Sequence, residues 1–182
     1  MAPAALALAL AVIAEKPPEP RPLLAPTGEA IVADALGEGV NRIGARFAGG
    51  LTLAAASIES AEGPGRAPRA GGKLVLELDW IREPVVDRGM GVFVHIEPSE
   101  GEGLNGDHVE LSQAVLIETA PAGKILRDLL PITLPTDAAK KQWKITVGLW
   151  RIRRGGKRVP IVDRGNAAAE DDEVLVATFD VK

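Results

Sequence analysis

Two neighbouring stretches of the chain carry the clearest pattern of apolar and polar positions. From Lys73 to Trp80, three leucines and a tryptophan alternate with Lys, Val, Glu and Asp. This two-residue period is typical of a strand with one buried face, and it predicts that Trp80 lies in the core. The stretch from Met90 to Ile96 is apolar at nearly every position and contains β-branched residues. That pattern favours a central strand that is covered on both faces.

Weaker patterns of the same kind recur along the rest of the chain. Gly49-Gly50 interrupts an apolar segment over residues 46–58 and predicts a tight turn, and Gly155-Gly156 predicts a hairpin turn. The segment 29–39 is ambiguous, because its apolar spacing also permits a short helix closed by glycine. Further extended segments are expected at residues 113–118, 124–134, 143–150 and 174–181, and loops at residues 62–72, 97–110 and 163–173.

This succession of short extended segments predicts an all-β protein. Seven or eight strands separated by turns, with almost no helix, are typical of an immunoglobulin-like or jelly-roll β-sandwich. We expect one such domain over residues 29–182. Aromatic residues make up only 3% of the chain. The core must therefore consist mainly of Val, Leu, Ile and Ala, with Trp80 and Trp143 as its large side chains.

The N-terminal part has a different composition. Residues 1–14 form an apolar run, too short to span a bilayer and of the length found in signal peptides, although no Lys or Arg precedes it. Residues 15–28 are rich in proline and predict a flexible, extended linker. We interpret residues 1–14 as a signal-like or anchor segment. This places the protein in the periplasm or elsewhere in the cell envelope, with membrane contact only through this segment. An ordinary disordered or docked N-terminus is the alternative.

Composition and charge exclude several kinds of chemistry. The 182-residue chain has no cysteine, which excludes disulfides, thiolate metal sites and thiol nucleophiles. Its formal net charge of −4 does not favour a nucleic-acid partner. None of the four serines lies in a Gly-x-Ser-x-Gly elbow, and no pair of carboxylates is singled out for glycoside hydrolysis. We therefore expect a protein that is not an enzyme and has no cofactor.

Several short motifs, taken in order, resemble those of a bacterial sandwich domain. They are Phe47–Leu53, Gly71–Leu74 leading to Trp80, Val92–Ile96, Asn105–His108, Gly123–Asp128, Val147–Trp150 and Arg158–Pro160. Over residues 43–181 the chain is similar to the non-catalytic β-sandwich attached to some family 39-type membrane glycosyltransferases, and to related exported proteins of unknown function. Residues 111–120 lack the Tyr-Pro and Trp that this family usually has. The resemblance implies an accessory domain of the cell envelope and no chemistry of its own.

The loop over residues 97–110 contains two possible ligand motifs. Residues 101–106 have the glycine spacing of a dinucleotide-binding fingerprint, but acidic residues and no helix follow, so we interpret them as loop glycines. Glu97, Asn105 and Asp107 supply oxygen ligands of the kind that Ca²⁺ prefers. They are our candidate metal ligands, and the metal that they would hold is a calcium ion with a structural role. The alternative is a solvated acidic loop.

The chain has two histidines, His95 and His108, and each has a structural and a metal-binding interpretation. His95 shares a strand face with Phe93, and we interpret it as a hydrogen-bonded core or edge imidazole. A zinc site would require both histidines to converge with Asp107. For Asp107 and His108 we favour hydrogen bonds between side chain and backbone that cap the loop.

The most informative surface feature is a basic stretch without acids between Lys140 and Arg158. In the alternating strand, Lys144 and Trp150 share the face opposite Trp143, which predicts an exposed indole beside cations. Such a surface could stack a sugar ring or hold an anionic glycan. The alternative is a solvated hairpin that protects a sheet edge. Our candidate ligand-binding residues are Trp150, Lys144, Arg151, Arg153, Arg154, Lys157 and Arg158.

These observations together predict a non-catalytic cell-envelope module. It would bind a glycan, in particular an anionic one, or an envelope protein; no nucleic acid is favoured. The alternative is a structural or assembly subunit that pairs with another chain through a sheet edge or an apolar patch and has no small-molecule ligand. The sequence does not predict an oligomeric state.

Overall fold

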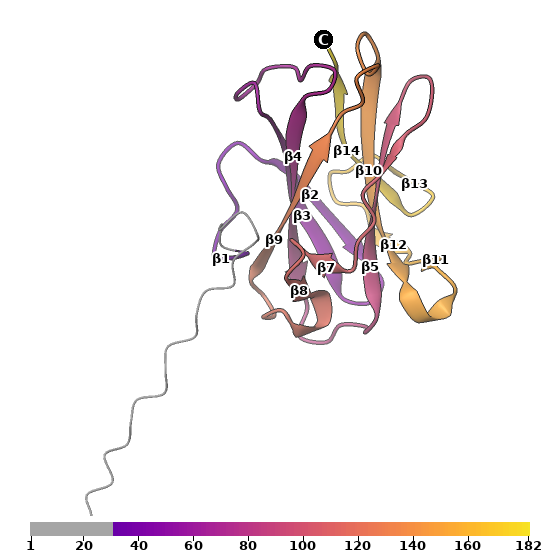
Figure 1. The fold of residues 1–182 in the computed structure, drawn as a ribbon. Helices are drawn as coiled ribbons and strands as arrows, with labels where there is room; N and C mark the ends of the chain where they lie inside the picture. Colours follow the sequence, from indigo (N-terminus) through magenta and orange to yellow (C-terminus); the bar gives the residue numbers. More distant parts are fainter. Residues whose placement is uncertain (1–30) are drawn as a thin grey trace, which may run out of the picture.

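Residues 31–182 fold into two antiparallel β-sheets that face each other across one hydrophobic core (Figure 1). The computed structural model describes these residues, apart from the side chain of Arg154. The predicted segments 1–14 and 15–28 lie outside the described residues. The predicted all-β sandwich is confirmed, whereas the choice between an immunoglobulin-like and a jelly-roll kind stays a prediction. Within residues 31–182, no helix has the length and apolar character needed to cross a membrane.

The first sheet contains six strands, in the spatial order β1-β9-β4-β3-β2-β12. They are β1 (Val32–Ala33), β9 (Ile125–Thr133), β4 (Lys73–Arg82), β3 (Leu51–Ser60), β2 (Asn41–Phe47) and β12 (Ile161–Asp163).

The second sheet has the order β13-β14-β10-β5-β6, and β11 pairs with the end of β10. Its strands are β13 (Ala169–Glu170), β14 (Glu173–Asp180), β10 (Gln142–Arg151), β5 (Met90–Pro98), β6 (Leu104–Asn105) and β11 (Lys157–Arg158). A small ribbon and two 3₁₀ turns complete the described chain: β7 (Glu110–Leu111), β8 (Val115–Leu116), η1 (Ile117–Thr119) and η2 (Ile152–Arg154).

The two stretches with the clearest sequence pattern become central strands of opposite sheets. β4 lies between β9 and β3, and its leucines and Trp80 are fully buried on the core face. The Trp80 ring packs at a tilt against Phe47, with 6.0 Å between ring centroids. β5 lies between β10 and β6, and its outward-facing Phe93 is also buried. The two-sided apolar pattern of β5 therefore reflects real cover on both faces.

Several boundaries differ from the sequence expectations. Segment 29–39 forms no helix within the described residues; it contributes the two-residue edge strand β1, which pairs with β9. The expected loop 97–110 contains β6 and a β-bridge between Val92 and His108. The expected strand 113–118 is reduced to β8 followed by η1. Each of these short elements depends on a partner distant in sequence, which local alternation does not reveal.

Both predicted glycine turns are confirmed. Gly49 and Gly50 have φ angles of 101° and 86° between β2 and β3, a region that side-chain-bearing residues rarely adopt. A Cβ on Gly50 would also lie 2.3 Å from the carbonyl oxygen of Val85. Gly155 and Gly156 likewise connect β10 to β11 with positive φ angles.

Candidate functional site

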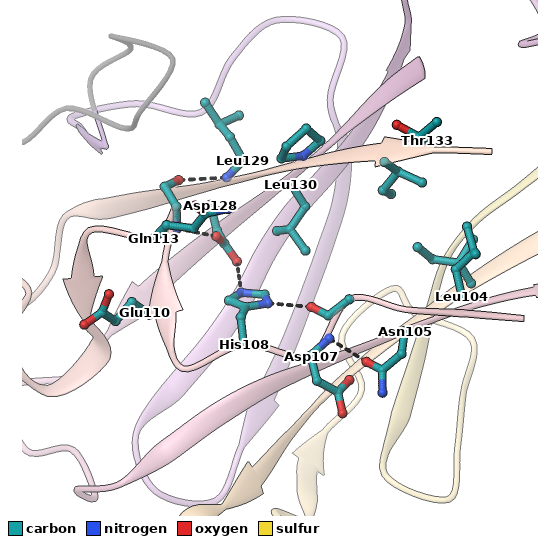
Figure 2. A pocket seen from close by; sticks show the side chains of 15 residues that line it. Leu104, Asn105, Asp107, His108, Glu110, Gln113, Asp128, Leu129, Leu130 and Thr133 are labelled. Atoms are coloured by element: carbon teal, nitrogen blue, oxygen red, sulfur yellow. Dashed lines mark hydrogen bonds and ion pairs between the residues drawn. The ribbon is translucent and has the colours of Figure 1, made fainter. Parts of the chain in front are cut away.

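A hollow of about 350 Å³ opens at one edge of the sandwich, between β6 and β9 (Figure 2). His108 crosses this edge. Its backbone N–H and C=O both pair with Val92 of β5, at 2.9 Å each. Its side chain reaches the other sheet, where Nε2 lies 2.8 Å from Oδ2 of the fully buried Asp128 on β9. We call His108, Asp128 and Ser112 the edge clasp, because this group joins the two sheets.

The protonation state of His108 follows from its two contacts. Its second ring nitrogen, Nδ1, lies 2.7 Å from the carbonyl oxygen of Gly106 (Figure 2). Both ring nitrogens therefore face oxygen acceptors, and only the imidazolium form donates to both. Burial alone would lower the pKa of His108, but the hydrogen bond to Asp128 and its negative charge raise the pKa above the ordinary value.

The remaining polar atoms of the edge clasp are also paired. Asp128 Oδ1 accepts the backbone N–H of Ser112 at 2.6 Å. Ser112 Oγ donates to the carbonyl oxygen of Arg127 at 3.1 Å and accepts the N–H of Leu129 at 2.8 Å. Because both ring nitrogens of His108 are engaged elsewhere, the imidazole is not placed to take a proton from Ser112. The edge clasp holds residues 105–112 against both sheets.

The three candidate calcium ligands are engaged with protein groups. Asn105 Oδ1 accepts the backbone N–H of Asp107 at 2.7 Å, and Asp107 Oδ1 accepts the N–H of Val94 at 3.0 Å. Glu97 is ion-paired with Lys144 at 2.9 Å. Within residues 31–182, no group of three or more His, Asp or Glu is arranged to hold a metal ion. The capping role expected for Asp107 and His108 is confirmed.

A second concave region lies on the face of the second sheet that points away from the core. One hollow of about 620 Å³ is lined by outward-facing residues of β10 and β14 and by the chain between β12 and β14. A neighbouring hollow of about 500 Å³ continues along the same two strands toward the turn after β5. Lys144 and Leu175 line both hollows. We call the joined hollows the outer groove. Its polar lining includes Ser99, Gln142, Lys144, Thr146, Arg158, Arg164, Glu170, Glu173 and Thr178.

The cations of the outer groove are balanced by acids from other strands. Hydrogen bonding between Lys144 and Glu97 raises the pKa of Lys144 and lowers the pKa of Glu97. Arg158 forms an ion pair with Glu173, donates to the carbonyl oxygen of Asp171 at 2.7 Å, and lies 5.0 Å from the centre of the Phe93 ring. The strongly basic surface suggested by the sequence is therefore neutralised here by Glu97 and Glu173.

The outer groove retains unused hydrogen-bonding capacity. The Lys144 ammonium has three N–H donors, of which the described residues engage one, with Glu97. The side chains of Lys144 and Glu97 are 54% and 47% exposed. Below the groove floor, the Thr146 hydroxyl has no hydrogen-bond partner among the described residues, but its oxygen is covered and does not add to this capacity. In this respect the outer groove differs from the saturated edge clasp.

The expectation of an exposed indole at Trp150 is wrong. Trp150 is half-buried, its Nε1 is covered, and a Cβ on the cross-strand residue Gly91 would lie 2.6 Å from the indole ring. Phe93 covers the cross-strand residue Gly148 in the same way and is only 4% exposed. Each aromatic ring fills the space above a glycine on the neighbouring strand, so one face of each ring is occupied by its own sheet.

The structure divides the remaining basic candidates between two places. Lys144 and Arg158 line the outer groove, as just described. Arg151 forms an ion pair with Asp87, and Arg153 lies beside it at one end of the sandwich; Lys157 is exposed in the same hairpin. For Arg154 the structure describes no side chain.

Sequence reasoning missed Thr146 and Glu173 of the outer groove, and also Arg88, which lines a small hollow with Arg151 and Arg153. Thr146 alternates with Lys144 along β10, so the two-residue period did place it on the outer face. Glu173 and Arg88 had no such signal, because their positions depend on strand order and on loop contacts.

No protein-family model matches the chain, and no curated protein matches it. Among solved structures, the chain is similar to the C-terminal domain of wzt, with 13% sequence identity and a TM-score of 0.46. The alignment covers 82% of this chain and 89% of that domain. The resemblance to the sandwich of family 39-type glycosyltransferases stays a prediction.

Proposed function

We propose that this protein is a non-catalytic β-sandwich module that binds a glycan chain in the outer groove. The proposal rests on one observation. Two hollows meet at Lys144 and Leu175 and together form one elongated polar groove along β10 and β14. An elongated groove suits a chain-like ligand better than a compact one. Hydroxyl, amide, ammonium and carboxylate groups line it, and these match the many hydroxyl groups of a sugar chain.

The charge balance of the groove favours a neutral or weakly charged glycan. Lys144 and Arg158 already have acidic partners, so an anionic ligand gains little from them without breaking an ion pair. A sugar hydroxyl can instead add to these pairs, because it accepts from one member and donates to the other. Recognition through hydroxyl groups therefore fits the groove better than the anionic glycan suggested by the sequence.

We also propose that the protein has no catalytic role and works in the cell envelope. Its one buried His–Asp pair has no spare ring nitrogen, which supports the first proposal. The apolar run of residues 1–14 supports the second.

A binding experiment with a matched control tests glycan binding. The full-length protein is applied to a glycan array of neutral and anionic oligosaccharides, together with Lys144→Ala and Lys73→Ala. Lys144 lies where the two hollows meet, whereas Lys73 is an exposed lysine at the start of β4 in the other sheet. We expect Lys144→Ala to be retained at least tenfold more weakly than the unmodified protein. Lys73→Ala should be retained as strongly as the unmodified protein. Both variants should fold normally, since exposed ion pairs contribute little to stability. Equal retention of all three proteins would contradict the proposal.

A second candidate function is assembly through the free edge of β14. Beyond β13, which pairs only with Glu173 and Val174, no strand of the described chain pairs with that edge. A largely apolar hollow of about 510 Å³ runs beside it, lined in part by Ile58, Val176 and Phe179. Concentration-dependent association in sedimentation, with no glycan retained, would favour this alternative. The corresponding edge of β9 is protected, because Pro131 has no N–H and Ser112 Oγ accepts the N–H of Leu129.

A further inference from the structure

One end of the sandwich combines two segments that are distant in sequence. The first segment is the connection between β4 and β5 (residues 83–89). The second is the hairpin formed by the end of β10, η2 and β11 (residues 151–158), which is found in Figure 1 by the label β11. The backbone N–H of Ile152 donates to the carbonyl oxygen of Gly89 at 2.9 Å. Arg151 pairs with Asp87 between the same segments. We call residues 83–89 and 151–157 the basic end; Arg158, the last residue of the hairpin, lines the outer groove instead.

Arginine side chains converge at the basic end. A hollow of about 320 Å³ is lined by Asp87, Arg88, Gly89, Arg151 and Arg153. Only Arg151 has an ion-pair partner there among the described residues, and that partner is Asp87. Arg88 and Arg153 are both exposed. Guanidinium groups bind phosphate oxygens through paired N–H donors, so the hollow suits a phosphate group.

The charge of the basic end is opposite to that of the whole chain. By sequence, these segments contain the cations Arg88, Arg151, Arg153, Arg154 and Lys157 and only the acids Glu83 and Asp87, whereas the protein carries a formal net charge of −4. A cationic end on an acidic protein orients the molecule toward a negatively charged surface. This orientation is a property of the fold, because residues 83–89 and 151–157 are brought together only in three dimensions.

Exposed apolar side chains accompany these cations. Val85 is 84% exposed, and Ile152 is 39% exposed. Cations beside apolar tips are the combination that membrane surfaces select, since the cations bind headgroups while the apolar groups enter the boundary layer. We propose that the basic end binds the phosphate-bearing headgroups of an anionic phospholipid surface. The outer groove lies on a sheet face, so the two sites are separate.

Vesicle binding tests this proposal directly. The full-length protein is sedimented with vesicles of 30% phosphatidylglycerol in phosphatidylcholine, and with vesicles of phosphatidylcholine alone, which measure any binding that needs no anionic headgroup. Arg88→Gln combined with Arg153→Gln should weaken the binding that depends on phosphatidylglycerol about thirtyfold. Val85→Ser should weaken it about fivefold. The control, Arg66→Gln combined with Lys73→Gln, removes two exposed cations from other parts of the described chain and should leave it unchanged.

The possible outcomes are distinct. Equal binding to both kinds of vesicle would overturn the proposal, and so would equal losses in the test and control variants. A titration with inorganic phosphate tests whether the basic end binds only small anions. Binding of phosphate without binding of vesicles would also overturn the proposal. Lys144→Ala should bind the vesicles normally. Failure of glycan retention and failure of membrane binding are therefore distinguishable.

Discussion

The edge clasp and the outer groove are both polar regions, yet they use their polar groups in opposite ways. In the edge clasp, His108, Asp128 and Ser112 give each polar side-chain atom a protein partner. In the outer groove, Lys144 and Glu97 are about half exposed, and the Lys144 ammonium has two N–H donors that no described residue engages. A buried polar network that is fully paired has no capacity left for a ligand. The comparison therefore favours a folding role for the edge clasp and supports our proposal that the outer groove binds a ligand.

A third polar cluster, on the outer face of the first sheet, sharpens this distinction. Asp79 is only 1% exposed, and neither of its oxygens has a hydrogen-bond partner among the described residues. Burial and the nearby charge of Glu77 raise the pKa of Asp79 to about 6, although Arg127 opposes this. None of the hollows described above includes Asp79. Unpaired polar groups therefore indicate a binding site only where they meet a hollow.

The largest expected effect comes from breaking the edge clasp. Asp128→Ala leaves a buried imidazolium and the N–H of Ser112 without their partner, and we expect it to lower the free energy of unfolding by about 3–5 kcal/mol. Urea denaturation measures this change. Asp34→Ala, which removes an exposed ion pair with Lys124, is the control and should leave stability unchanged. An equally small effect at Asp128 would mean that the edge clasp does not hold the sheets together.

A change of opposite sign is expected at Asp79. Its folded pKa of about 6 lies above the ordinary value of 3.8, so its contribution to stability is complete below pH 4 and is lost as the pH rises through 6. Asp79→Asn should therefore raise the free energy of unfolding at pH 8, by up to about 3 kcal/mol, and change it much less at pH 4. Denaturation at the two pH values checks this. A destabilised variant at pH 8 would show that the ion pair between Asp79 Oδ1 and Arg127 Nε, 3.7 Å apart, outweighs the cost of burying the carboxylate.

A smaller pH effect is expected from His108. Because its pKa is raised in the folded protein, its stabilising contribution is complete below about pH 6.5 and is lost as the pH rises through the folded pKa. The melting temperature should therefore fall at alkaline pH, and His108→Gln should remove that part of the fall. A pH profile identical in the two proteins would contradict the imidazolium assignment.

The sequence predicted those parts of the molecule that depend on local alternation. β4 and β10 each have one apolar face, and that face is turned toward the core as predicted. The position of Trp150 over Gly91 was not predictable, because it depends on the register between β10 and β5. The neutralisation of the basic stretch was missed for the same reason, since Glu97 and Glu173 come from neighbouring strands.

The edge clasp was only partly visible in the sequence. Asp107 and His108 were expected to cap a loop, and they do. The partner Asp128 is 20 residues further along the chain and lies on the core face of β9, where alternation alone would place an apolar residue. Such non-local polar pairs are set by packing of the two sheets, which no local pattern contains.

Amide chemical-shift mapping tests the contrast between the two regions most directly. An oligosaccharide retained on the array is titrated into ¹⁵N-labelled protein. We predict concentration-dependent shifts for Lys144, Thr146, Glu173 and Leu175, and none for His108 and Ser112. Shifts centred on His108 and Ser112, with the outer groove unchanged, would contradict the assignment of binding to the groove and of folding to the edge clasp.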